Sequence, residues 1–196
     1  MGQKQYSFSS ELRAAQDTGD NGMILEGKAI TFDSPTVLYE IAGVQYKEVI
    51  NNRALDHTDL SDVVLRYNHT GTFTVLARTR NKSLELIKQP DGLYIRAKLQ
   101  PDISQHQDVY NAVKAGLVDK MSFGFVAADR GDSYDSKSNT RSINDIRKIF
   151  DVSVVDQPAY DETYVEARSR MEQFVDIQAY RESVMIRAQL LKVRLK

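Results

Sequence analysis

The chain contains no cysteine among its 196 residues. This absence excludes disulfide bonds, a thiol nucleophile and any metal site built from thiolates. No segment approaches the roughly 20 consecutive apolar residues of a membrane-spanning helix, and no apolar run opens the sequence, so we expect a protein that is neither membrane-embedded nor exported. The 26 basic and 27 acidic residues leave a formal net charge of −1, which gives no reason to expect a nucleic-acid partner.

What the sequence does contain is a series of short strand-like runs. Hydrophobic residues make up 41% of the chain, which is enough for one well-packed domain. Apolar runs bounded by turn residues predict strands at 24–32, 62–67, 72–78, 84–88 and 93–99. The last two runs alternate apolar and polar residues on either side of Gly92, which favours a hairpin. We therefore predict an α+β fold that is mainly β.

One helix interrupts the strands. Val109, Ala112 and Val113 recur at helical spacing and predict a helix over 103–116, with Ser104 able to cap its start and Gly116 its end. Apolar runs at 120–128 and 143–155 predict two further strands. Between them, the almost wholly polar residues 129–142 predict a mobile, exposed loop.

The end of the chain has a different pattern. From residue 161 to residue 196 there is no glycine or proline, and apolar residues recur at intervals of three, four or seven. This pattern predicts a long amphipathic helix, which could pack on the domain or bind a partner. We divide the chain into a folded domain over 1–165 and a helical tail over 166–196 that could be detachable.

Three residues suggest chemistry. Ser122 lies between large apolar residues in the run Met121–Phe125, and Gly124 follows it closely. His69 directly follows a predicted strand, and Asp151 opens an apolar strand that would bury its carboxylate. A serine hydroxyl becomes a useful nucleophile only when a base accepts its proton, and imidazole suits that task. The ordered set His69, Ser122 and Asp151 therefore favours acyl transfer, with Gly124 leaving room for an oxyanion.

Each of these residues also has a structural interpretation. A serine within an apolar strand is more commonly a small core residue than a nucleophile, and a histidine in a turn is more commonly a surface residue. Asp156 competes with Asp151 for the third role. The other histidines are weaker candidates, since His57 lies in a polar stretch and His106 near the start of the predicted helix.

Taken in order, these segments resemble the prohead protease family of tailed bacteriophages, of the HK97 type. The likeness covers most of residues 24–168. It is carried by Asp62–His69, by Gly116–Phe125 with its Met-Ser-Phe-Gly-Phe motif, and by Asp151–Tyr160, where Val-Ser-Val-Val precedes Pro-Ala-Tyr. The family usually has glutamate where this chain has Asp151.

This resemblance implies a serine endopeptidase with an assemblin-like fold, similar to the herpesvirus maturation protease. Such a fold is a closed or partly open antiparallel β-barrel surrounded by helices. The resemblance assigns His69 as general base and Ser122 as nucleophile, with Asp151 as the third member, and it implies no cofactor or metal. The substrates would be the major capsid protein or a scaffold protein, and the enzyme itself, inside the procapsid in the host cytoplasm. A homodimer is a further implication.

Two other functions are compatible with parts of the pattern. A non-catalytic assembly or scaffold protein could bind coat subunits through the helical tail. A metallohydrolase using His57 and His69 is less favoured, because no two histidines have the spacing of metal ligands on a helix.

Overall fold

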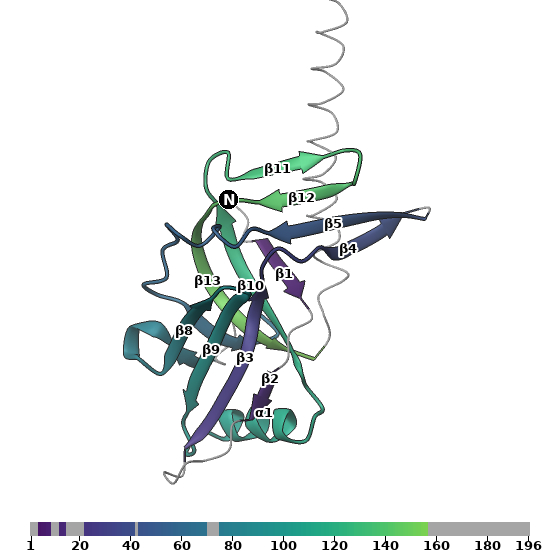
Figure 1. Ribbon diagram of the computed structural model, residues 1–196. Helices are drawn as coiled ribbons and strands as arrows, with labels where there is room; N and C mark the ends of the chain where they lie inside the picture. Colours follow the sequence, from purple (N-terminus) through teal and green to yellow (C-terminus); the bar gives the residue numbers. More distant parts are fainter. Residues whose placement is uncertain (1–3, 9–11, 15–21, 42, 70–74, 157–196) are drawn as a thin grey trace, which may run out of the picture.

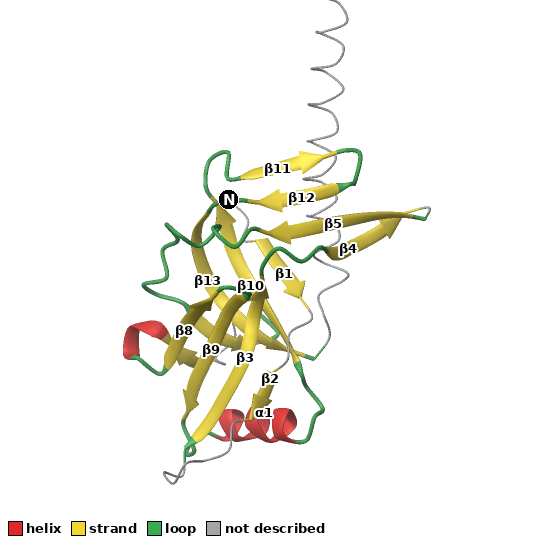
Figure 2. Cartoon of the chain, in the orientation of Figure 1, coloured by secondary structure: helices red, strands yellow, loops and turns green. Residues whose placement is uncertain are grey.

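Strands dominate the folded part of the chain. The structure, a computed structural model, describes residues 4–8, 12–14, 22–41, 43–69 and 75–156. Figure 2 shows that strands make up most of these residues, together with a helix, α1 (Ser104–Lys114), and a short 3₁₀ turn, η1 (Thr79–Asn81). No helix in this described part is long and apolar enough to cross a membrane. The prediction of a mainly β fold is therefore confirmed.

The first sheet carries the candidate site. It has five strands, which lie in the order β1 (Lys4–Phe8), β10 (Lys120–Ala127), β13 (Ile146–Val155), β6 (Val64–Tyr67) and β7 (Val75–Arg78). Its neighbours pair antiparallel, except that β13 and β6 are parallel. β1, near the start of the chain, thus lies beside β10, and β10 pairs with β13 (Figure 1).

Two four-stranded sheets complete the described fold. One has the order β2 (Leu12–Ala14), β3 (Met23–Thr31), β9 (Gly92–Leu99) and β8 (Leu84–Gln89). The other has the order β11 (Asp132–Asp135), β12 (Thr140–Ile143), β5 (Val44–Ile50) and β4 (Thr36–Ile41), and it projects from one end of the molecule in Figure 1.

The core lies between the five-stranded sheet and the β2–β3–β9–β8 sheet. β3 lies against β10, and β7 lies against β9, while α1 covers one end of β2, β3 and β9. Phe123 and Phe125 contribute stacked rings with centroids 5.3 Å apart, and both are fully buried. Leu25 and Ile95 bury their side chains from the facing sheet. Large apolar side chains on both inner faces therefore hold the two sheets together.

The predicted hairpin across Gly92 is confirmed, because β8 and β9 pair antiparallel from Gln89 and Gly92 outward. A side chain at Gly92 would place its Cβ 2.2 Å from the carbonyl oxygen of Ile30, so the neighbouring β3 requires glycine there.

The predicted helix is also confirmed, and Gly116 ends it in the left-handed region with φ +71°. The prediction that Ser104 caps the start was wrong. Ser104 is the first helical residue, and Ile103 holds the cap position without a side-chain hydrogen bond.

The prediction of a polar loop over 129–142 was wrong, since β11 and β12 form an antiparallel hairpin there. Charge neutralisation explains this result. Arg141 is 1% exposed, and its guanidinium donates from Nη1 to Glu48 Oε2 at 2.9 Å and from Nε and Nη2 to Asp132 Oδ2 at 2.9 Å and 2.5 Å. The two carboxylates thus offset the desolvation cost of burying the Arg141 guanidinium, although the composition of the segment is typical of a loop.

The strand pairing among the described residues forms three open sheets, and a closed barrel is not found in it. It also departs from the expected antiparallel arrangement in two places, where β13 pairs with β6 and β12 pairs with β5 in parallel. These partners are far apart in sequence, so no tight turn dictates their direction. The predicted helical tail and the boundary at residue 165 lie outside the described residues.

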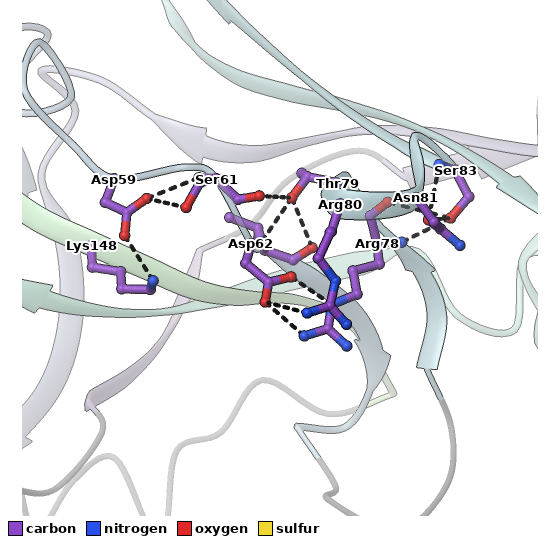
Figure 3. A network of polar contacts seen from close by, with 10 residues as sticks. Asp59, Ser61, Asp62, Arg78, Thr79, Arg80, Asn81, Ser83 and Lys148 are labelled. Carbon is purple, nitrogen blue, oxygen red and sulfur yellow. Dashed lines mark hydrogen bonds and ion pairs between the residues drawn. The ribbon is translucent and has the colours of Figure 1, made fainter.

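A surface network fixes the segment that leads into β6 (Figure 3). Asp62 accepts hydrogen bonds from Arg78 Nε at 2.5 Å and Nη2 at 2.7 Å, and Asp59 accepts one from Lys148 Nζ at 2.7 Å. These cations hold the pKa of both carboxyls below the ordinary value. The entry to β6 is thereby tied to β7 and to β13.

Candidate active site

The two central strands separate apolar from polar side chains. Successive side chains of a strand point to opposite faces of the sheet. Phe123 and Val152, which are paired across β10 and β13, belong to the core. Ser122 and Ser153, the next pair, therefore face the other side together, and both are fully buried. A buried polar strip thus crosses the middle of the sheet.

Asp151 lies two residues before Ser153 along β13, so it shares this polar side, and a β-bulge directly precedes it. Gly124 pairs with Asp151 and Phe125 pairs with Ile149, so Phe150 is the extra residue between the two pairs. The bulge allows Ile149 to remain in the core while Asp151 shares a face with Ser153. Gly124, opposite Asp151, adds no side chain to that face.

A left-handed turn positions His69 at the end of β6. Asn68 and His69 have φ values of +51° and +53°, a conformation that asparagine tolerates better than most residues. The Asn68 amide donates to the carbonyl of Val154, and its side-chain oxygen accepts from the Asp156 amide at 3.1 Å. The turn is thus tied to the end of β13 from both sides.

Asp156 also accepts a hydrogen bond from the Tyr67 hydroxyl at 3.0 Å. Burial, and then this carboxylate, raise the pKa of Tyr67, so the phenol remains a neutral donor well above pH 7. Asp156, which competed for the third role, therefore anchors the turn, its carboxylate through Tyr67 and its backbone amide through Asn68.

Asp151 holds the ring of His69. Its Oδ1 lies 2.7 Å from His69 Nδ1, and the two side chains are only 8% and 6% exposed. A carboxylate accepts hydrogen bonds, so Nδ1 carries the proton and Nε2 is the basic nitrogen. Nε2 is buried and has no hydrogen-bond partner among the described residues. A buried nitrogen in that condition is suited to receive a proton from a reacting group.

Ser153 joins this pair. Its hydroxyl donates to Asp151 Oδ1 at 2.9 Å, and its oxygen lies 3.2 Å from His69 Nδ1. Ser153 was not among the residues predicted from the sequence. The signal was its spacing of two residues from Asp151, which places both side chains on one face of a strand.

The structure places the three predicted residues on adjacent elements. His69 and Asp151 are in direct contact. Ser122 lies on β10 opposite Ser153, and residues paired in this way have Cα atoms about 5 Å apart. Ser122 is thus one strand spacing from the residue that touches both His69 and Asp151.

The other two histidines have different surroundings. His57 is exposed in the turns between β5 and β6. His106 is buried in α1, where its Nδ1 accepts from the Gln100 amide and its Nε2 lies 3.0 Å from the Val75 carbonyl, so backbone groups occupy both ring nitrogens. Over the described ranges, no group of three or more histidine or carboxylate side chains is arranged to hold a metal ion.

Two comparisons with known proteins both find phage proteases. The profile of a family described as caudovirus prohead serine protease matches residues 9–177. Among solved structures, the capsid assembly protease of bacteriophage T4, gp21, is similar with a TM-score of 0.52 at 12% identity, over 80% of this chain and 98% of that one. At that identity the likeness concerns the fold alone. A search of curated proteins finds no significant match.

Proposed function

Because the chain belongs to the caudovirus prohead serine protease family, we propose that it matures the phage capsid with Ser122 as nucleophile, His69 as general base and Asp151 as the carboxylate that orients the imidazole. The observation that carries the assignment is the His69 ring, whose Nδ1 lies 2.7 Å from Asp151 while Nε2 is buried without a partner among the described residues.

The proposed reaction follows the usual scheme of a serine protease. Ser122 Oγ attacks the scissile carbonyl as its proton passes to His69 Nε2, and Asp151 stabilises the imidazolium that forms. The imidazolium then gives the proton to the leaving amine, which frees one product and leaves an acyl group on Ser122. Water then attacks the acyl group as its proton passes to Nε2, and the imidazolium returns that proton to Ser122 Oγ as the acid is released. Gly124, which has no side chain, would leave room for the oxyanion.

Ser153 is a positioning residue in this scheme. Its hydroxyl donates to the same Asp151 oxygen that faces His69, so it fixes the carboxylate and shares the Nδ1 proton. Two features argue against Ser153 as the nucleophile. It contacts Nδ1, the nitrogen that Asp151 already holds, and its own proton is directed to a carboxylate.

The substrates would be the major capsid protein, a scaffold protein and the enzyme itself, within the procapsid. Enclosure there would give the high local substrate concentration that a modest enzyme needs. Since β11 and β12 take up half of residues 129–142, self-cleavage is better assigned to the segment beyond residue 156, where the tail over 166–196 would be removed from a protease domain over 1–165. The enzyme would act as a homodimer. The two sheets that enclose the core would form a partly open, assemblin-like barrel.

Intact-mass spectrometry tests this function. Wild-type protein incubated with its capsid protein should yield lower-mass products of both chains, and Ser122→Ala should yield none. His69→Ala should match Ser122→Ala, whereas His57→Ala, which removes an exposed histidine away from the site, should match wild type. Unchanged masses in the wild-type reaction would contradict the proposal. Normal capsid assembly with Ser122→Ala, together with failure when residues 162–196 are deleted, would favour a non-catalytic assembly protein.

A further inference from the structure

The outer edge of β10 bears a short segment of the chain's own N-terminal region. β1 pairs antiparallel with β10 from Lys4 opposite Phe125 to Phe8 opposite Met121, and this register sets Ser7 opposite Ser122. We propose that this edge is the docking site for an extended segment of the substrate, which pairs with β10 as an added strand, and that β1 occupies the site until substrate replaces it. This inference rests on the proposed role of Ser122.

The position of this edge within the sheet supports the assignment. An extended peptide binds a sheet by adding a strand to an edge, where main-chain hydrogen bonds provide the affinity. The five-stranded sheet has β1 at one end and β7 at the other. β7 lies three strand spacings from β10, about 14 Å, whereas β1 lies directly beside the strand that carries Ser122 (Figure 1).

The burial of Ser122 indicates that a neighbouring segment must move. Its exposed fraction is 0%, so a substrate carbonyl cannot reach the hydroxyl in this arrangement. β13 is the other strand paired with β10, but it carries Asp151 and Ser153 and lies at the centre of the sheet. β1 is hydrogen-bonded to β10 alone among the described strands, so of the two strands paired with β10 it is the one that leaves at the lower cost.

Replacement of β1 by substrate would conserve the main-chain pairing of β10. The substrate strand restores the backbone hydrogen bonds that β1 gives up, so the exchange exposes no unsatisfied edge. Occupancy by β1 then lowers the apparent substrate affinity by the fraction of molecules in which the edge is free. The N-terminal strand would thereby restrain the protease until substrate is abundant, as it is inside a procapsid.

Proline substitution in β1 tests the competition in the full-length protein. Successive residues of a strand direct their amides to opposite edges, so one of the two amides of Tyr6 and Ser7 faces β10. The double substitution Tyr6→Pro with Ser7→Pro removes that donor, whichever of the two residues provides it. If β1 occupies the edge nine-tenths of the time, KM for the capsid protein should fall about tenfold with kcat unchanged. Tyr6→Ala with Ser7→Ala keeps the backbone donors and should leave KM near the wild-type value. An unchanged KM in the proline variant would overturn the inference.

Hydrogen exchange tests the same exchange of strands without catalysis and without proline. The full-length Ser122→Ala protein is mixed with a synthetic peptide of residues 2–10 at about 10 mM, since a tethered strand competes at an effective concentration of about millimolar. Amides of residues 4–8 in the protein should lose protection while those of residues 121–125 keep it. Unchanged protection of residues 4–8 would overturn the inference. If the peptide replaces β1 but the wild-type protein does not cleave its capsid protein, the proposed function fails and the inference about the docking edge is retained.

Discussion

The carboxylate of Asp151 lies 2.7 Å from Nδ1 of His69, although 82 positions separate the two residues in the chain. The parallel pairing of β6 with β13 brings them together, because it carries the left-handed turn after β6 to the end of the strand that bears Asp151. Both side chains are almost fully buried, so the contact is shielded from water and from salt. It fixes the ring with Nε2 as the basic nitrogen.

Replacing Asp151 with asparagine should lower kcat by about 10⁴-fold, because an amide no longer selects the ring form with the proton on Nδ1. KM and the melting temperature should change little. Asp151→Glu retains a carboxylate on a longer side chain and should fall between wild type and Asp151→Asn. Steady-state kinetics on a capsid-derived peptide measure the series, and Asp151→Asn with wild-type kcat would remove Asp151 from the mechanism.

Ser153→Ala should lower kcat roughly 10- to 100-fold, since a hydrogen bond to a charged group contributes about 1.5–3 kcal/mol. KM should not change, because the hydroxyl contacts Asp151 and His69 and belongs to the orienting pair. Ser153→Cys, which retains a small polar side chain, should recover part of the loss. A complete loss of turnover in Ser153→Ala, with Ser122→Ala still active, would exchange the roles of the two serines.

Substitutions of Asn68 separate its backbone conformation from its side-chain contact. Asn68→Ala loses the acceptor for the Asp156 amide and holds alanine in the left-handed region, a strain of roughly 1–2 kcal/mol. Asn68→Gly loses only the acceptor, and Asn68→Asp keeps both features. Urea unfolding should therefore rank stability as Asp above Gly above Ala, with kcat in the same order because the turn positions His69. Equal stability of the Gly and Ala variants would contradict this account of the turn.

The network at the entry to β6 predicts sensitivity to acid. Arg78 holds the pKa of Asp62 below its ordinary value of 3.8, so this pair stabilises the folded state above about pH 4, and the stabilisation disappears as pH falls through the lowered pKa. Asp62→Asn should be less stable than wild type at pH 7, and the difference should shrink toward pH 2. Asp108→Asn, at an exposed carboxylate on α1, provides the control. A difference that stays constant from pH 7 to pH 2 would show that the ion pair is not responsible.

Much of the fold can be predicted from local patterns. Period-two alternation and the turn at Gly92 predicted the β8–β9 hairpin, and helical spacing with Gly116 predicted α1. The β11–β12 hairpin was missed because Arg141 is buried against Asp132 of the same hairpin and against Glu48 of β5, and no local pattern assigns Glu48 to it. The parallel strand pairs were missed for a similar reason, since their direction depends on long-range packing.

The candidate site could be predicted in part. The order of His69, Ser122 and Asp151 along the chain suggested their roles, and the choice between Asp151 and Asp156 required three-dimensional geometry. Both aspartates lie in or beside the same strand, but the left-handed turn after β6 brings the imidazole to Asp151, whereas Asp156 contacts Tyr67. Neither feature has a sequence signature of its own.

Covalent labelling of Ser122 tests the central claim most directly. A fluorophosphonate should add one group to the full-length protein, and peptide mapping should locate it on Ser122. Ser122→Ala should not be labelled, and His69→Ala should be labelled far more slowly, because the hydroxyl then lacks its base. Ser153→Ala should still be labelled on Ser122. An adduct on Ser153, or labelling of Ser122→Ala at the wild-type rate, would contradict the assignment of Ser122 as the nucleophile.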